Sequence, residues 1–332
     1  MFPMNPIIRD PSRYTPQWGI LGSDNPLGIR LFPEGIVYFV HSENPNANDQ
    51  NLGTDPQFPM STVLAAYNRC TAGQNDVVVV VGQASGYAQA ATLTWAKNYT
   101  HMIGISPDVL GVGQRVRLTG SGTADITPIM TVSADGCMFQ NLQFFNGHDA
   151  AVDSGAVLVS GSRNYFERVF FAGMASAVAG ARAGSYSLKV SGEENTFVRC
   201  SVGLQTIIRA AANAELVLSG AGCYRNRFVE CEFISWSVTA GKFLVSLDAT
   251  SVPWVTHFEN CEFDNLNMTA GGAAGGALGN AFNDASLAMH QVILKGKVIF
   301  VGCTGVADTL THIWSAEPVP ATGFGISVNP AA

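Results

Sequence analysis

The segment Asn226-Arg227-Phe228-Val229-Glu230-Cys231-Glu232-Phe233 is the clearest copy of a motif that recurs along this chain of 332 residues. The motif consists of Phe, two variable residues, then Cys, Val or Leu, one variable residue, and Phe or Val. The first phenylalanines of its copies are Phe139, Phe166, Phe197, Phe228, Phe258 and Phe300. They are separated by 27, 31, 31, 30 and 42 residues. A repeat of this length is typical of a solenoid, in which each copy supplies one coil.

A second apolar segment, most often ending in a Ser/Gly turn, precedes each copy. These segments are Ile129–Ser133, Val157–Gly161, Leu188–Gly192, Leu216–Gly220, Leu244–Ser246 and Val292–Gly296. The residues between the two segments lack the 3.6-residue periodicity of an amphipathic helix, which disfavours a leucine-rich repeat. Propeller blades need about 40 to 50 residues and four strands. We therefore predict an all-β fold, a right-handed parallel β-helix whose coils stack at about 4.8 Å.

Stacking of the coils predicts columns of equivalent residues along the solenoid. With the copies aligned, one inward column contains Leu142, Val169, Cys200, Cys231, Cys261 and Cys303. A small thiol suits a tightly packed interior, so we interpret these cysteines as buried and reduced. A zinc site needs several thiolates converging with tetrahedral geometry, and one cysteine per coil does not supply them. We expect neither a metal nor another cofactor.

The composition excludes several classes of function. Hydrophobic residues make up 47% of the chain and charged residues 13%, well below the usual value of about 25%. The net charge of −7 disfavours nucleic-acid binding. The apolar runs are too short to span a membrane. The start of the chain, Met1–Pro6, lacks the basic and apolar regions of a secretory signal, and the odd total of seven cysteines disfavours a disulfide framework.

The chain divides into three predicted parts. Residues 1–60 contain nine of the fifteen prolines and are expected to form an extended arm with one strand near Gly35–Val40. Residues 61–305 form the β-helix, and its first residues, 61–71, are predicted to be a short helix that caps the solenoid. Residues 306–332 are expected to form a C-terminal cap. The arm is apolar enough to pack against something, and the sequence leaves open whether this is its own solenoid or a partner.

The aligned copies also predict columns on the outer surface. One contains Gln143, Phe170, Ser201, Glu232, Glu262 and Thr304, and another contains Asn141, Arg168, Arg199, Glu230, Asn260 and Gly302. Glu232 and Glu262 are then neighbours on successive coils, and paired carboxyl groups are the machinery of glycoside hydrolysis. Alternatively, these two columns form a solvent-exposed surface or an interface and have no catalytic function. Arg199 and Glu230 are expected to form an ion pair between coils.

The segments that follow the arm resemble the opening of phage-type, pectate-lyase-like β-helix proteins. The resemblance rests on Gly53–Pro56, Phe58–Pro59, the predicted helix, Asp76 and the valine run after it, and then on Thr92–Gly104 and Val116–Gly120. It covers residues 50–305. It implies the β-helix fold and a protein of a tailed-phage particle, either a capsid decoration protein (head spike) or a tail spike. Function must still be argued from the sites, because one fold supports many functions.

The prediction that follows is a structural protein of the virion, assembled in the host cytoplasm. It would form a homotrimer, with Phe170 as an exposed aromatic residue at the trimer interface. It would bind the major capsid protein or another virion protein through its arm, and a host surface glycan is a further partner. The anchoring residues of the arm are predicted to be Phe2, Ile7, Ile8, Arg9 and Trp18.

The alternative prediction is a tail spike that binds or cleaves host polysaccharide. Glu232 and Glu262 are its candidate catalytic residues, and Trp236 and Trp254 are its candidate sugar-stacking residues. A secreted adhesin is disfavoured because Met1–Pro6 does not resemble an export signal.

Overall fold

The computed structural model describes part of the chain. The described residues are 35–106, 116–120, 126–148, 152–237, 243–247, 255–267, 273–274, 278–283, 291–307, 313–315 and 327–329. The predicted anchors Phe2, Ile7, Ile8, Arg9 and Trp18 lie outside them, as does Trp254. The helices in the described part of the chain are too short to cross a membrane.

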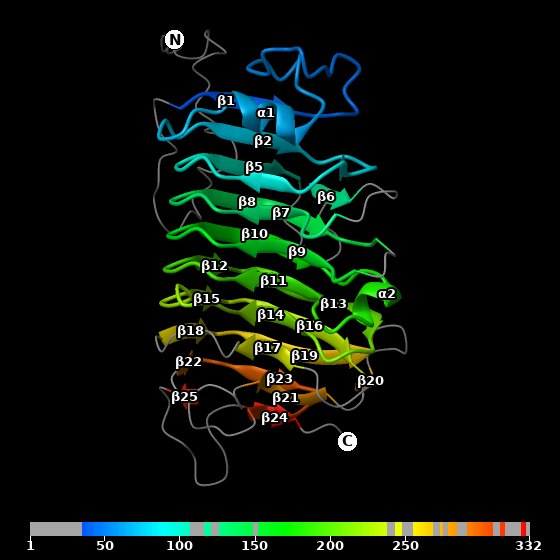
Figure 1. Cartoon of the computed structure of the whole chain (residues 1–332), viewed down its shortest axis with the longest axis vertical. Coiled ribbons are helices and arrows are strands. Elements are labelled where there is room, and N and C mark those ends of the chain that lie inside the picture. The colour runs from blue at the N-terminus through cyan, green and yellow to red at the C-terminus, as the bar shows by residue number, and fades with distance from the viewer. Residues whose placement is uncertain are drawn as a thin grey trace, which may run out of the picture.

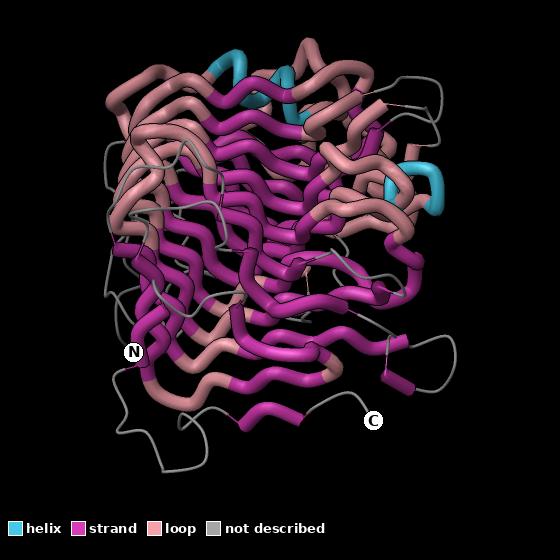
Figure 2. Tube along the Cα trace, turned by 60° about the horizontal axis from the view of Figure 1, so that its bottom comes forward, coloured by secondary structure: helices cyan, strands magenta, loops and turns pink. Residues whose placement is uncertain are grey.

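The described strands stack in coils along one long axis, as Figure 1 shows. An 18-stranded sheet bends at one corner of the coil into two faces, which we call sheet 1 and sheet 2, and an 8-stranded sheet forms the third face, sheet 3. Strand pairs between successive coils are parallel, for instance Phe228 of one coil with Phe258 of the next. Figure 2 shows the strands of successive coils aligned one behind another. The predicted parallel β-helix is confirmed.

Each face takes one strand, or half of a long strand, from each coil. Sheet 1 contains β1 (Val37–Val40), β2 (Val77–Val81), β5 (His101–Ile105), the first halves of β8 (Met138–Phe145) and β10 (Tyr165–Ala172), β12 (Thr196–Val198), β15 (Arg227–Val229), β18 (Val255–Glu259), β22 (Gln291–Lys295) and β25 (Ile313–Ser315). Sheet 2 contains β3 (Tyr87–Gln89), β6 (Arg117–Gly120), the second halves of β8 and β10, β13 (Ser201–Arg209), β16 (Glu232–Ser237), β19 (Glu262–Asn267), β23 (Ile299–Val301) and β26 (Ser327–Asn329).

Sheet 3 contains β4 (Leu93–Trp95), β7 (Met130–Val132), β9 (Gly155–Val159), β11 (Tyr186–Val190), β14 (Ala214–Leu218), β17 (Phe243–Leu247), β21 (Leu278–Asn283) and β24 (Cys303–Ala307). Three elements stand apart from these faces. They are the helices α1 (Val63–Arg69) and α2 (Ala177–Gly180) and the short strand β20 (Ala273–Ala274), the eighteenth strand of the larger sheet, which pairs antiparallel with β19.

Stacked phenylalanine rings fill the interior at the spacing of the coils. The centroids of Phe166 and Phe197 are 4.8 Å apart, and those of Phe197 and Phe228 are 4.6 Å apart, with interplanar angles of 9° and 8°. Phe228 and Phe258 continue the stack at 4.9 Å. These distances match the separation of neighbouring strands, so one aromatic ring per coil forms a continuous column.

The chain turns from sheet 1 to sheet 2 through a column of left-handed residues. The φ angles of Asn141, Arg168, Arg199, Glu230 and Asn260 lie between 51° and 54°. Left-handed backbone is uncommon for residues other than glycine, and here it recurs at one position of each coil. The predicted outer column that contains Arg199 and Glu230 therefore forms the corner between the two sheets. Within it, Arg199 Nε donates to Glu230 Oε2 of the next coil at 2.8 Å, as predicted.

An asparagine ladder holds the corner between sheet 3 and sheet 1. Asn195 Oδ1 accepts a hydrogen bond of 2.9 Å from the backbone N–H of Asn164, and Asn226 Oδ1 accepts one of 2.9 Å from that of Asn195. The Asn195 and Asn226 amide groups also donate to the carbonyls of Gly161 and Gly192, at 3.0 Å each. These asparagines are buried, so the ladder satisfies backbone groups that water does not reach.

The predicted capping helix is confirmed as α1. Its N-cap Thr62 accepts a hydrogen bond of 3.2 Å from the backbone of Ala65, and the Tyr67 ring lies 4.3 Å from the ring of Trp95 in β4. Lys97 donates to backbone carbonyls at the end of the helix, including that of Cys70 at 2.7 Å. The helix thus covers the first strand of sheet 3 at the N-terminal end of the solenoid.

Strands at both ends extend the solenoid into the predicted arm and cap. The strand expected near Gly35–Val40 is β1, and it pairs with β2 as the first strand of sheet 1. At the other end, β25 pairs with β22 and β26 pairs with β23.

The predicted register is wrong in the last coils. Phe300 pairs with Phe263, not with Phe258, whose partner is Leu294. The reason is that Val292–Gly296, expected in sheet 3, overlaps β22 of sheet 1, while β21 supplies the strand of sheet 3.

Two predicted columns change at this end as a result. Cys303 lies in sheet 3, so the inward cysteine column consists of Cys200, Cys231 and Cys261. In the outer column, the partner of Glu262 is Ile299 and not Thr304.

Candidate functional site

Glu232 and Glu262 lie side by side on the outer surface of sheet 2. They are register partners in β16 and β19, and the phenylalanines that follow them, Phe233 and Phe263, point into the core. The predicted pairing of the two carboxylates on successive coils is therefore confirmed. Both side chains are half-buried, and Ser201 Oγ of the preceding coil donates to Glu232 Oε2 at 3.1 Å.

A third carboxyl group, Asp264, completes the cluster, and sequence analysis missed it. Asp264 lies two residues after Glu262, and residues two apart in a strand share one face. Its register partners are Ile234 and Val301 on the neighbouring coils. The sequence did contain a signal for Asp264: side chains alternate between the two faces of a strand, so Asp264 lies on the same face of β19 as Glu262.

The environment of Asp264 keeps a proton on the cluster near neutral pH. Burial raises the pKa of Asp264 to about 7, and the carboxylate of Glu262, a hydrogen bond with it, and the charge of Glu232 act in the same direction. Its Oδ1 atom is buried and has no hydrogen-bond partner among the described residues. A carboxyl group that holds a proton at neutral pH can act as a general acid beside an ionised neighbour.

An aromatic side chain lies on the same face of the strand as Glu232. Trp236 follows Glu232 by four residues in β16 and is half-buried, and its Nε1 atom has no hydrogen-bond partner among the described residues. The exposed part of the indole ring lies on the same face of β16 as Glu232 and offers a surface on which a sugar ring can stack, whereas its Nε1 donor is buried. Among the described residues, no three His, Cys, Asp or Glu side chains are placed to hold a metal ion.

Phe170 is buried, so the prediction of an exposed aromatic residue there is wrong. Its side chain is 2% exposed and packs in a small outer cluster with Ala172, Leu204 and Ile207. The physical reason is a bulge in β13. Leu204 pairs with Ser235 and Ile208 pairs with Trp236, so three extra residues loop out between them, and Leu204 and Ile207 at this bulge pack in the cluster with Phe170. The predicted homotrimer itself does not depend on this residue and stays a prediction.

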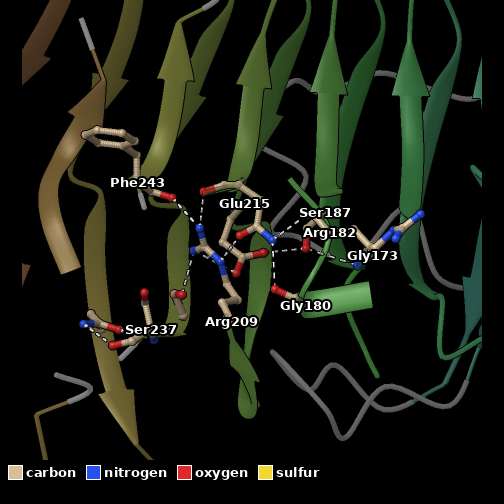
Figure 3. A network of polar contacts seen from close by, with 11 residues as sticks. Gly173, Gly180, Arg182, Ser187, Arg209, Glu215, Ser237 and Phe243 are labelled. Carbon is tan, nitrogen blue, oxygen red and sulfur yellow. Dashed lines mark hydrogen bonds and ion pairs between the residues drawn. The ribbon is translucent and has the colours of Figure 1, made fainter. Parts of the chain in front are cut away.

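A buried ion pair lies where this bulge meets sheet 3. Arg209 ends β13, Glu215 lies in β14, and both side chains are 1% exposed, with 3.3 Å between Nη1 and Oε1. Figure 3 shows the network around the pair. Arg209 also donates to Ser235 Oγ at 2.7 Å and to the Phe243 carbonyl at 3.0 Å, and Ser187 Oγ donates to Glu215 at 2.6 Å.

The hydrogen bonds of this network hold the bulged end of β13 in place. Asn213 accepts from Arg209 Nε at 2.7 Å and donates to the carbonyls of Gly180 and Arg182 at 3.1 and 2.9 Å. Burial raises the pKa of Glu215 and lowers that of Arg209, while their pairing opposes both shifts. The pair was not predicted because neither residue belongs to a repeated column.

Comparison with known proteins identifies the fold. No family model matches the sequence, and no curated protein is significantly similar to it. A pectin methylesterase from Aspergillus niger in deglycosylated form has a similar structure, with a TM-score of 0.52 and 15% identity over 89% of this chain and 91% of that one. Pectate lyase Pel9A has a TM-score of 0.51 and 14% identity over 86% of this chain and 82% of that one.

A phage protein is also among the similar structures. Tailspike protein 2 of bacteriophage CBA120 has a TM-score of 0.38 and 10% identity over 76% of this chain and 40% of that one, too weak a likeness to bear on function. The stronger matches show that this chain has the right-handed parallel β-helix fold of pectate lyases and pectin methylesterases. At these identities they show the fold and leave the activity to be argued from the site.

Proposed function

We propose that this protein is a structural component of a tailed-phage particle, a trimeric capsid decoration protein that attaches by the N-terminal end of its solenoid. The observation that carries the proposal is the set of exposed apolar side chains at that end. Leu52 is 72% exposed, and Phe58 and Leu64 are each 50% exposed. Large apolar side chains gathered on one part of a surface are typical of an interaction site.

The loop that carries Leu52 and Phe58 is held in a fixed conformation, and Leu64 lies in α1, which follows it. Asp49 Oδ1 accepts from the backbone N–H groups of Ser61 and Thr62 at 2.9 Å each, which ties the loop to the start of α1. Asn51 donates to the Pro59 carbonyl at 2.9 Å. Figure 1 shows this loop beyond β1, at the end of the molecule. A preorganised apolar surface loses little conformational entropy when it binds.

The resemblance seen in the sequence and the predicted arm support the same orientation. The described chain begins at Gly35, at this end, and the proposed anchors Phe2, Ile7, Ile8, Arg9 and Trp18 precede it in the sequence and lie outside the described residues. No Lys or Arg lies between residues 41 and 60, whereas Glu43, Asp49 and Asp55 do, which favours a partner surface with basic residues.

Co-sedimentation with undecorated phage capsids tests this function. The full-length protein should sediment with the capsids, and the triple variant Leu52→Ser, Phe58→Ser, Leu64→Ser should remain in the supernatant. The matched control is Trp314→Ser, which removes a side chain that is 56% exposed in β25, near the opposite end, and should bind normally. Equal binding by the triple variant and the control would contradict attachment by the N-terminal end.

A second candidate function is that of a tail spike that binds or cleaves a polysaccharide. The cluster of Glu232, Glu262 and Asp264 favours it, because its shared proton provides an acid beside a carboxylate. Host surface polysaccharides should then be cleaved, and Glu232→Gln, Glu262→Gln and Asp264→Asn should each abolish cleavage without altering assembly. An absence of cleavage across the host's polysaccharides, together with capsid binding, would leave the decoration protein.

A further inference from the structure

Two outer surfaces of the solenoid that share a corner carry opposite charge on the same coils. We call the outward side chains of β16, β19 and β23 in sheet 2 the acidic face. We call those of β15, β18 and β22 in sheet 1 the basic face. Each strand of one face belongs to the same coil as a strand of the other, β15 with β16, β18 with β19 and β22 with β23 (Figure 1).

The acidic face combines apolar side chains with carboxyl groups. Along β16, β19 and β23 the outward, half-buried side chains alternate with fully buried ones. The outward set includes Glu232, Glu262, Asp264, Ile234, Trp236 and Leu266. It contains no Lys, Arg or His, so this apolar surface has a net negative charge.

The basic face has an excess of positive charge. Arg227, whose side chain is 52% exposed, pairs with Glu259 at 2.5 Å. Lys295 lies half-buried in β22, and among the described residues no carboxylate lies within ion-pair distance of it. Burial lowers the pKa of His257, the register partner of Arg227, and the positive charges of Lys295 and Arg227 act in the same direction. Lys297 is exposed at the corner after β22.

Apolar side chains also accompany the charges of the basic face. Val229, Val255 and Ile293 are outward and half-buried in its three strands. Both faces therefore offer apolar surface with charged groups beside it, which is the composition of a protein–protein contact. Their opposite charges make them complementary to each other.

We propose that the acidic face of one copy of this chain binds the basic face of a second copy. Contact between two acidic faces is disfavoured, because it would bring like charges together. Contact between two different faces is heterologous, and such contacts either close into a ring or continue as a filament. Since the two faces lie on the same coils, copies with parallel axes meet without a shift along the solenoid, which favours a closed ring.

This contact deepens the proposed trimer by naming the surfaces that meet. Only the number of copies in the ring rests on the proposed function. The corner between sheets 1 and 2, with its pair of Arg199 and Glu230, would then face the axis of the ring. The contact would cover Glu232 and Glu262, so it opposes the candidate function in which these residues cleave a polysaccharide.

Charge reversal in the full-length protein tests the contact, with the mass of the assembly measured by sedimentation velocity. The acidic-face variant is Glu232→Lys, Glu262→Lys, and the basic-face variant is Arg227→Glu, Lys295→Glu. Each should raise the dissociation constant of the assembly by about a hundredfold, because like charges then face each other. The combined variant with all four substitutions has the two charges exchanged and should assemble again.

The control variant is Lys189→Glu, which reverses a half-buried charge in β11 of sheet 3 and should assemble normally. A monomeric unmodified protein, or reversed variants that assemble as the unmodified protein does, would overturn the proposal. A combined variant that unfolds cooperatively on heating but stays monomeric would overturn it as well.

Salt provides a second measurement if a reversed variant does not fold. Raising NaCl from about 0.1 M to about 1 M shortens the range of charge interactions from about 10 Å to about 3 Å. The unmodified assembly should then dissociate, and an equal mass at both salt concentrations would contradict the proposal.

Capsid co-sedimentation reports separately on the virion role. An unmodified protein that assembles through these faces but remains in the supernatant would contradict the virion role and leave the contact standing. An unmodified protein that binds capsids as a monomer would contradict the contact alone.

Discussion

Arg209 and Glu215 form an ion pair at the corner between sheets 2 and 3, with 3.3 Å between Nη1 and Oε1 and with both side chains 1% exposed. The pair joins the end of β13 to β14 and holds the bulge that covers Phe170. The contribution of this ion pair to the free energy of unfolding is measured by removing one partner.

We expect Glu215→Gln to lower the free energy of unfolding by about 3 to 5 kcal/mol, because it leaves the guanidinium of Arg209 buried without its charge partner. Denaturant unfolding followed by tryptophan fluorescence measures this. The control is Glu230→Gln, which breaks the exposed pair with Arg199 and should cost less than about 1 kcal/mol. Similar losses in the two variants would show that the buried pair contributes no more than a surface one.

The Asp264 carboxyl should make stability fall as the pH rises. Its pKa is raised from 3.8 to about 7, so the folded protein holds a proton that the unfolded chain has released. Its contribution is fully present below about pH 4 and is lost as the pH rises through 7. Asp264→Asn should therefore be more stable than the unmodified protein at pH 8, by on the order of 2 kcal/mol after allowance for solvent screening. Parallel pH profiles of the two proteins would argue against a protonated Asp264.

His101 should have the opposite effect on stability and make it fall as the pH drops. Burial lowers its pKa from 6.5 to about 4, and its Nδ1 atom accepts a hydrogen bond of 3.1 Å from the backbone N–H of Met138. Below about pH 6.5 the unfolded chain takes up a proton that the folded protein does not, so stability falls as the pH drops from 6.5 towards 4. Thermal unfolding at pH 7.5 and 5 should show a smaller drop for His101→Asn than for His41→Asn, which serves as the control. Equal drops would contradict a buried neutral imidazole.

The asparagine ladder should be sensitive at each step. Asn195→Ala removes the acceptor of the Asn164 N–H and leaves this buried donor without a partner, at a cost of about 1 to 3 kcal/mol. Hydrogen exchange of the Asn164 amide should accelerate. The control Asn46→Ala alters an exposed asparagine and should change neither quantity. Unchanged exchange at Asn164 would show that another group holds that amide.

The repeat predicts most of the fold because the coils stack with little variation. The alignment on Phe228 correctly predicts the Phe166–Phe197–Phe228–Phe258 stack, the Glu232–Glu262 pair and the bond from Arg199 to Glu230, since each depends only on the distance between copies. It fails where the copies differ. The coil after Phe258 contains additional residues, so a phenylalanine match alone assigned Phe300 to the wrong column.

The features that the sequence did not reveal are those that occur once. The bulge after Leu204 hides Phe170, and nothing in the motif signals three extra residues within β13. Arg209 and Glu215 have no counterparts in other coils. Asp264 was predictable from the alternation of β19, but its raised pKa depends mainly on the burial of its carboxyl group, which the alternation does not give.

The asparagine ladder and the ring stacks connect each coil only to the coils before and after it, so the length of the molecule is modular. Phe166, Phe197 and Phe228 recur every 31 residues with the same neighbours. Deleting or duplicating one such unit would join equivalent ladder and stack positions again. The solenoid can therefore shorten or lengthen in steps of about 4.8 Å. The distance between its apolar N-terminal surface and the carboxyl cluster can change in this way while both surfaces keep their structure.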